Sequence, residues 1–487
     1  MSVTERLAEI VGQDRVLTSP EKIAHYGRDK STEAPGQLIC VVRPRTVSQT
    51  QKVIELANDL KFSVVPQTSL VHFHGGAVPK EGGVVLDLGG MDRIQEIVEG
   101  SMVAHLQVGV TWEKFCKELE AKGYTPIIPL LPHASRSVIM DYLEREHPVM
   151  QNHEVAEPLL SMQVVWGNGE LFVTGSASVA HFRHGSCLAD GVLPTGPGPM
   201  SYDTFLYGSQ GTLGVVTWGV VEIEDKPTMS KAFFIPATSL DQLVEPTYQI
   251  LRAGICSECM ILNDVNLAAI LANSPEQLQH LKAILPSWTL VLVQRALRRR
   301  PEEKMAYQAN ALRQMMSASF RNLDLWETLP GLAAAEKVLP EMLRKPWPKD
   351  KTYWKHVFRG GCEDLQFMTT LERMVLYPSE VETVAAEYQY ATGDIGVYIQ
   401  PVQDGHACQM QFSFFYDPED TTEKAVIREL RRQATSAVMA RGAYITRPYP
   451  VIADLVYQKY GEYASLLKRF KKHFDPNGIL NPGNLCL

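Results

Sequence analysis

Glycine-bearing turns that each follow a strand-like apolar run are the feature that most restricts the fold of this chain. They stand at His74–Gly75–Gly76, Gly82–Gly83, Gly208–Gly214 and Asn477–Gly478. Glycine lets the backbone approach a ligand closely and present N–H groups to a pyrophosphate. The sequence has no GxxxxGK[ST] motif and no GxGxxG between a strand and a helix. Any one of these turns is typical of an ordinary loop, so only their combination is informative.

The N-terminal region shows an alternation of strand and helix patterns. The run Leu38–Thr46 predicts a strand, and Phe62–Pro66 predicts a second one. The residues between them predict an amphipathic helix, whose apolar face would be formed by Val53, Ile54, Ala57 and Leu60. This order of strand, helix and strand indicates an α/β unit.

The sequence pattern changes at Lys226–Pro227, from short strand-like runs to alternating long helices and strands, and this predicts a domain boundary. A length of 487 residues is typical of two or three domains. Before the boundary, the Asn-Gly pair in Gly167–Glu170 predicts a β-hairpin. After it, from Met229, long helices alternate with strands, and Gly396–Asp417 predicts a hairpin of two long strands. The following residues, Thr421–Arg441, predict one helix.

The composition excludes several classes of partner. A net charge of -8 argues against nucleic acid and anionic membranes, which select basic surfaces. The sequence has no apolar run of 18 residues and no signal peptide pattern, so we expect a cytoplasmic protein without a membrane span. Eight scattered cysteines do not form a disulfide framework, and the lone CxxC of Cys256 and Cys259 is interpreted as buried thiols.

Six motifs in order resemble one flavoprotein family. They are VVRPRTVSQTQKVIELAN, HGGAVPKEGGVVLDLGGMDRI, VGVTWEKFCKEL, YGSQGTLGVVT, QPVQDGHACQMQFSFFYDP and FKKHFDPNGILNPGN. The sequence is similar to the vanillyl-alcohol oxidase and p-cresol methylhydroxylase type, whose relatives include the flavin-binding chain of glycolate oxidase. The resemblance implies an α+β protein that binds FAD. It implies a two-part FAD-binding domain, 1–224 and 437–487, with an inserted α/β substrate cap, 225–436.

The resemblance also implies which residues hold FAD. They lie in the loop after the second strand, in the turn at Ser137, in the glycine-rich turn and in the tail: Pro66, Gln67, Thr68, Ser69, Leu70, Val71, His72, Gly75, Gly76, Ser137, Gly208, Gly211, Thr212, Gly214, Val215 and Asn484. The sequence departs from the family where a glycine-rich run is replaced by Gln67–His72, and where a Ser-Ile-Gly-Gly turn is replaced by Ser137–Asp141. β-Carbons at Leu70 and Val71 make close backbone approach harder.

The same resemblance assigns catalysis to His74, Tyr444 and Arg447. In the phenol-oxidising branch, a tyrosine of the first loop and a Tyr-Arg pair near the C-terminus stabilise a substrate phenolate, and these three residues stand at or near those positions. A histidine with an ordinary pKa of about 6.5 can accept a proton or, when charged, hold an oxyanion. A guanidinium can meet a phenolate or a carboxylate in two-pronged fashion.

The hairpin at Gly396–Asp417 bears on flavin attachment and on metals. Some relatives attach flavin covalently near this hairpin, but Cys408 and Gln409 do not match the attachment residue, so we expect non-covalent FAD. The metal-binding HxGDGNxH of the glycolate-oxidase branch is also absent, so no metal is expected. We assign substrate binding on this hairpin to Gln400 and His406.

The sequence therefore predicts an FAD-dependent oxidase or dehydrogenase that removes a hydride from an alcohol or a para-substituted phenol to flavin N5. Two alternatives stay open: a dehydrogenase of 2-hydroxy acids such as glycolate or D-lactate, and a flavin-less scaffold subunit of a redox complex. We expect a small-molecule substrate, an electron-acceptor protein or partner subunit, and a homo-oligomer. The sequence identifies neither the substrate nor the acceptor.

Overall fold

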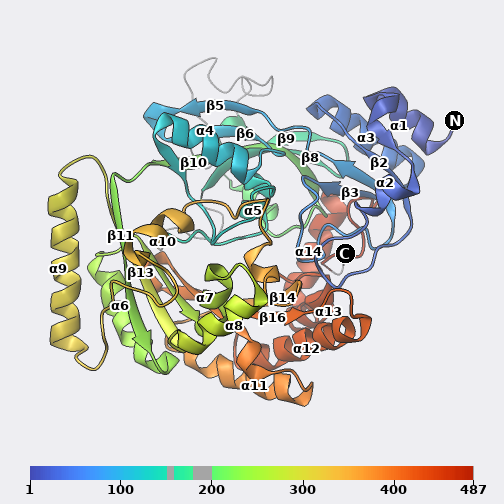
Figure 1. The fold of residues 1–487 in the computed structure, drawn as a ribbon. Coiled ribbons are helices and arrows are strands. Elements are labelled where there is room, and N and C mark those ends of the chain that lie inside the picture. The colour runs from blue at the N-terminus through green and yellow to red at the C-terminus, as the bar shows by residue number, and fades with distance from the viewer. Residues whose placement is uncertain (151–157, 179–199, 486) are drawn as a thin grey trace.

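The computed structural model describes residues 1–150, 158–178, 200–485 and 487, and these residues form three β-sheets with helices packed around them (Figure 1). The two sheets of the N-terminal half lie on one side of the molecule and the third sheet lies on the other (Figure 1). None of the helices in the described ranges combines the length and the apolar character needed to cross a bilayer.

The first sheet has four strands in the order β1-β2-β4-β3. Its strands are β1 (Val16–Leu17), β2 (Leu38–Val42), β3 (Val64–Gln67) and β4 (Gly83–Asp87). Strands β2 and β3 both pair with β4 in parallel. The helices of this region are α1 (Val3–Val11), α2 (Pro20–Ala24) and α3 (Val47–Leu60). The strand–helix–strand unit predicted from the sequence is present.

Helix α3 follows the predicted pattern except at its end. Val53, Ile54 and Ala57 are buried, as expected, but Leu60 is 42% exposed. Leu60 is the last helical residue, and the chain turns away at Lys61, whose φ is 57°. The expectation that Leu60 belongs to the apolar face was therefore wrong, because the helix stops before this side chain can reach the core.

The second sheet is built mainly from antiparallel pairs. Its strands are β5 (Ile94–Val98), β6 (Val103–Gln107), β7 (Tyr124–Pro126), β8 (Leu159–Trp166), β9 (Leu171–Val173) and β10 (Gly214–Asp225). Strand β10 pairs with β6, β7 and β8. Strands β8 and β9 form the hairpin predicted at Gly167–Glu170. Helices α4 (Trp112–Lys122) and α5 (Val138–Leu143) belong to this region.

The third sheet has six antiparallel strands in the order β11-β13-β12-β15-β16-β14. These are β11 (Met229–Ala237), β12 (Glu258–Asn263), β13 (Trp288–Ala296), β14 (Gly361–Thr369), β15 (Gly396–Val402) and β16 (Ala407–Tyr416). The helices around it are α6 (Val244–Ala253), α7 (Asp264–Leu271), α8 (Pro275–Ile284), α9 (Pro301–Ser319), α10 (Ala335–Leu343), α11 (Tyr377–Glu387) and α12 (Thr421–Ala440). Strands β15 and β16 form the hairpin predicted from the sequence.

Strands β14 to β16 alternate between an apolar and a polar face, and both faces are buried. The apolar side chains, such as Ile399, Met410 and Phe412, pack in the core beneath the sheet. On the opposite face, Gln409 and Gln411 are each 4% exposed. Alternation of this kind usually indicates a strand with one face in water. Here the polar face is covered by another part of the chain instead.

The C-terminal segment returns to the N-terminal sheets through helices α13 (Pro450–Lys459) and α14 (Gly461–Phe474) (Figure 1). Leu480 forms a bridge with Val64 of β3, and the buried Lys471 donates its Nζ–H to the carbonyl of Thr212 at 2.6 Å. Residue 437, the expected start of this segment, lies inside α12, because the apolar face of that helix continues along the third sheet.

Candidate functional site

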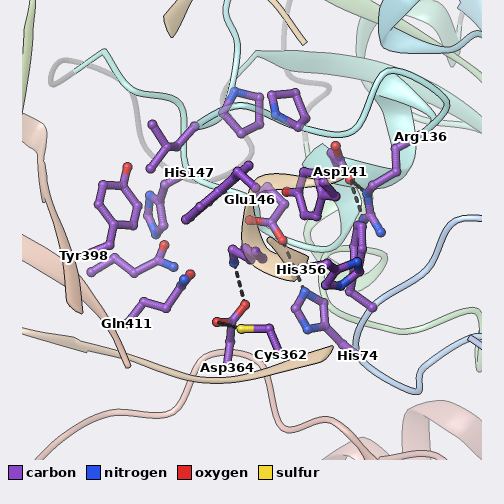
Figure 2. Close-up of a pocket in the computed structure, with 18 residues that line it drawn as sticks. His74, Arg136, Asp141, Glu146, His147, His356, Cys362, Asp364, Tyr398 and Gln411 are labelled. Carbon is purple, nitrogen blue, oxygen red and sulfur yellow. Dashed lines mark hydrogen bonds and ion pairs between the residues drawn. The ribbon is translucent and has the colours of Figure 1, made fainter. Parts of the chain in front are cut away.

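Two adjoining cavities lie where the three sheets meet. The first, here called the cradle, is lined mostly by apolar and small residues: Pro66, Thr68, Gly76, Ala77, Leu88, Val108, Met140, Leu143, Glu144, Leu206, Ser209, Gln210, Gly211, Gly214, Val215 and Val216. The second, here called the polar cavity, is lined by Phe73, His74, Pro129, Leu130, Pro132, Arg136, Asp141, Glu146, His147, Tyr353, Trp354, Lys355, His356, Cys362, Asp364, Tyr398, Gln409 and Gln411 (Figure 2).

The cradle is held together by the C-terminal tail. Asn481 donates its Nδ2–H groups to the carbonyls of Gly76 and Gln210, both at 2.7 Å, so one side chain joins the two loops that line the cavity. Asn484, predicted to bind the cofactor, contacts the same Gly76 carbonyl at 3.4 Å and does not line the cradle. The C-terminal tail therefore holds the loops of the cradle in place, and Asn484 does so without lining the cavity.

Glycine at 211 is required by the cradle's geometry. Gly211 has a φ of 70°, in the left-handed region that favours glycine, and a β-carbon there would lie 2.6 Å from Cγ of Pro66. Both residues line the cradle. A side chain at 211 would strain the turn and press against the opposite wall.

The predicted cofactor residues fall into two groups. Those that line the cradle are Pro66, Thr68, Gly76, Gly211, Gly214 and Val215. The others support its loops or lie outside it: Gln67, Ser69, Leu70, Val71, His72, Gly75, Ser137, Gly208, Thr212 and Asn484. Gln67, for example, donates its Nε2–H groups to the carbonyls of Tyr26 and Ala77. Ser137 accepts the backbone N–H of Met140 and so begins α5.

The sequence departure at Leu70 and Val71 does not intrude on the cradle. The Leu70 side chain is 55% exposed, and neither residue lines the cavity. The two β-carbons therefore take no part in the wall of the cradle, and their effect on close backbone approach to FAD stays a prediction.

The unpaired polar atoms of the cradle suit the chemistry of FAD. Thr68 Oγ1 and Gln210 Oε1 are buried and have no hydrogen-bond partner among the described residues. Buried polar atoms are nearly always paired in native proteins, so unpaired atoms on a cavity wall point to a ligand. FAD carries hydroxyl, phosphate and ring nitrogen groups that could pair with both of them.

Buried ion pairs line the polar cavity on two sides, one group from the N-terminal half of the chain and one from the third sheet. Arg136, which is 4% exposed, donates its Nε–H to Asp141 at 2.6 Å, and its Nη2 lies 2.8 Å from Glu144. Lys355 Nζ lies 2.5 Å from Asp364 on β14. Burial would lower the pKa of Arg136, but Asp141 and Glu144 together raise it well above its usual value.

His74 and Arg447 both contact Glu146. His74 Nε2 lies 3.5 Å from Glu146 Oε1, and Arg447 donates its Nη1–H to the same oxygen at 2.7 Å (the His74 pair is dashed in Figure 2). Burial favours the neutral acid, but Arg447 and then His74 hold the pKa of Glu146 well below its usual value. The imidazole of His74 also stacks on the ring of Tyr449, with centroids 4.6 Å apart.

Tyr444 does not join this group. Its side chain is 53% exposed and stacks on Tyr460, while its backbone pairs with Met368 of β14. The expected convergence of His74, Tyr444 and Arg447 is therefore wrong for Tyr444. The side chain of the neighbouring Ile445 packs in the core, so the side chain of Tyr444 points towards solvent.

The two hairpin residues predicted to bind substrate lie outside the polar cavity. His406 is exposed beside the turn between β15 and β16. Gln400 is fully buried, accepts the hydroxyl of Tyr398 at 2.7 Å and donates to the carbonyl of Cys259 at 3.1 Å. Gln400 lies opposite Gln409 on the same face of the hairpin, but its amide is engaged by Tyr398 and by the Cys259 carbonyl. Gln409, Gln411 and Tyr398 line the cavity instead.

Most residues of the polar cavity escaped the sequence analysis. Two signals were visible: the charged run Leu143–Pro148 and the alternation of Gln409, Gln411 and Ser413 on a predicted strand. Tyr353 to His356 left no such signal, since they come from a loop before β14. Their place at the site depends on contacts such as the stacking of Phe73 on Tyr353, with centroids 5.0 Å apart.

Comparison with known proteins agrees with this architecture. Residues 38–175 match a family model described as an FAD binding domain, and 452–485 match the C-terminal domain of FAD linked oxidases. The structure superposes on p-cresol methylhydroxylase with bound substrate with a TM-score of 0.82 at 17% identity, covering 99% of this chain and 96% of that one. The chain thus has the fold of this flavoprotein and carries two segments typical of FAD-linked oxidases. It therefore carries an FAD-binding domain of the p-cresol methylhydroxylase type.

Two sequence relatives carry the names of enzymes of 2-hydroxy acids. A glycolate oxidase subunit of Bacillus subtilis is 26% identical over 259 residues, 52% of this chain and 51% of that protein. A D-2-hydroxyglutarate dehydrogenase of Xanthomonas citri pv. viticola is 24% identical over 278 residues, 55% of this chain and 54% of that protein. The chain thus spans about half the length of these curated relatives.

Proposed function

We propose that the protein is an FAD-dependent oxidoreductase that removes a hydride from an alcohol or a para-substituted phenol bound in the polar cavity. One observation carries this proposal: the same short loops line both cavities. Gly76 and Ala77 line the cradle while His74 lines the polar cavity, and Glu144 lines the cradle while Glu146 lines the polar cavity. A cofactor in the cradle would therefore be a direct neighbour of the substrate. FAD, when bound, supplies the hydride acceptor.

In this proposal, His74 takes the proton from the substrate oxygen. Its Nε2 faces Glu146, which would stabilise the imidazolium that forms, and Arg447 keeps Glu146 ionised. A base oriented by a carboxylate is a common arrangement for proton transfer. Arg136 and Lys355 would fix the walls of the cavity through their own carboxylate partners.

A dehydrogenase of 2-hydroxy acids is a second candidate, favoured by the names of the sequence relatives. His74, Glu144 and Glu146 place their ligand atoms within 4.8 Å of one another, which suits a divalent cation. Against this, Arg136 and Arg447 already pair with the two glutamates. Arg136 and Lys355, which line the cavity, are likewise paired with carboxylates and less available to a substrate carboxylate.

Anaerobic reduction of the FAD-loaded protein separates the two candidates. We expect 4-methylphenol or 4-(hydroxymethyl)phenol to bleach the flavin absorbance, and chelator treatment to leave the rate unchanged. Reduction by D-lactate or glycolate alone, lost with chelator and restored by a divalent metal, would favour the second candidate. A protein that takes up no FAD would favour the scaffold alternative.

We further propose that FAD is bound without a covalent link. Cys408 is fully buried in the apolar core of the third sheet, on the face opposite the polar cavity, and glutamine at 409 cannot attach flavin. Acid precipitation should therefore release the yellow colour into the supernatant, whereas colour in the pellet would contradict the proposal. The cytoplasmic location, the electron-acceptor protein or partner subunit and the homo-oligomer also remain proposals.

A further inference from the structure

Three buried side chains on the wall of the polar cavity end in polar atoms that have no hydrogen-bond partner among the described residues. They are Nε1 of Trp354, Nδ1 of His147 and Oε1 of Gln409. Trp354 is 1% exposed, and His147 and Gln409 are each 4% exposed. Because native proteins rarely leave such atoms unpaired, these three indicate a missing hydrogen-bonding partner.

The three residues come from separate parts of the chain. Trp354 begins a short turn of helix before β14, His147 follows α5, and Gln409 lies on β16. Figure 2 shows His147 beside Tyr398, near the glutamine-bearing strand of the cavity. An isolated packing fault would affect one residue. Three unpaired atoms from three elements around one cavity are better explained by a shared ligand.

The charged groups of the cavity are paired, in contrast. Asp141 is paired with Arg136, Asp364 with Lys355, and Glu146 with Arg447. The unused hydrogen-bonding capacity among these lining residues is therefore on neutral groups. Burial also lowers the pKa of His147 to about 3, so this imidazole stays neutral.

We propose that Trp354, Gln409 and His147 form a specificity subsite that binds a second, uncharged hydroxyl group of the substrate, distinct from the oxygen that His74 deprotonates and away from the carbon that is oxidised. A hydroxyl can accept a hydrogen bond from the indole N–H and donate one to the glutamine oxygen. A carboxylate can only accept, and a methyl group can do neither. This inference rests on the proposed function, because it assumes that substrate enters the polar cavity.

The test uses two pairs of probes that each differ by one hydroxyl: 4-methylphenol with 4-methylcatechol, and D-lactate with D-glycerate. The FAD-loaded full chain is compared with Trp354→Phe, which keeps the ring and removes the N–H, and with Gln409→Met, which removes the acceptor. Trp347→Phe is the matched control, because its indole N–H is already bonded to the Thr352 carbonyl and it does not line the cavity. Apparent Kd values come from the concentration dependence of anaerobic flavin reduction, or from perturbation of flavin absorbance.

For the pair that binds, each subsite variant should raise the Kd of the probe with the extra hydroxyl about 5- to 10-fold, the value of one neutral hydrogen bond. The Kd of the other probe should stay within about twofold, and Trp347→Phe should change neither. An equal rise in Kd for both probes of a pair, or no rise for either, would overturn the proposed subsite. Flavin reduction by neither pair would refute the proposed function alone, since absorbance perturbation still reports the Kd values. Binding of no probe would overturn both.

Discussion

The cradle and the polar cavity share walls but are built in opposite ways. The cradle is lined by glycine and apolar side chains, and Glu144 is its one charged residue among those described. The polar cavity has carboxylates, cations and histidines on several sides. A cavity lined by small and apolar residues suits a ligand that is bound through shape complementarity and van der Waals contacts. A cavity of compensated charges suits chemistry in which a proton moves, because charge can shift among fixed partners.

The largest expected difference between the cavities appears on replacing His74. His74→Ala should lower turnover per bound flavin about 100- to 10,000-fold, the contribution of a positioned acid or base, while FAD stays bound. Flavin occupancy and flavin-normalised reduction rate are measured on the same preparation. If the loss lies in flavin retention and the normalised rate is unchanged, His74 supports its loop and is not catalytic.

Glu146→Gln tests whether the ion pairs hold the polar cavity together. The change leaves the guanidinium of Arg447, whose side chain is 2% exposed, without its carboxylate. Removing one partner of a buried pair should cost about 3 kcal/mol of unfolding free energy, measured by denaturant titration. Glu120→Gln is the control, because its partner Lys226 is half exposed and the loss should stay below about 1 kcal/mol. Similar losses in both variants would contradict the comparison.

Gly211→Ala tests whether the cradle depends on shape. The substitution places an alanine in the left-handed backbone conformation of position 211. Its methyl group also collides with Pro66 on the opposite wall. We expect a loss of about 1–2 kcal/mol from backbone strain, together with weaker FAD binding in a flavin titration. Gly254→Ala supplies the matched control, since Gly254 also has a positive φ of 61° but has nothing within 4 Å of the added carbon. Equal FAD affinity in the two variants would show that FAD binding does not depend on the shape of the cradle.

The last test, on a residue outside both cavities, separates burial from function. Burial lowers the pKa of His105 and of His356 to about 4, and that of His147 to about 3. The unfolded chain takes up these protons near pH 6.5, so stability is full above that pH and falls as pH drops towards 4. His105 lies outside both cavities, and His105→Gln should flatten this slope by up to about 1.4 kcal/mol per pH unit without changing turnover. Parallel stability curves for the variant and the native chain would refute it.

The sequence predicted the cradle better than the polar cavity, for a physical reason. Glycine turns and a β-hairpin are local: Gly211 is needed because of its own φ, and its neighbours in the chain lie on the same wall. His74 could also be placed, since it stands in the same loop. Tyr444 was placed wrongly because its direction depends on side-chain alternation, which a one-residue shift reverses. His406 was placed wrongly because it stands at the exposed turn between β15 and β16 and not on a strand.

The sequence by itself therefore determined the order of strands and helices in the first sheet, the hairpins and the loops around the cradle. The tertiary structure alone decided which charges meet. Arg447 reaches Glu146 across 301 positions of sequence. Gln409, His147 and Trp354, from three distant segments, line one cavity only in the folded chain. Local patterns record the preferences of neighbouring residues, whereas a catalytic cavity is fixed by packing between segments that are distant in the chain.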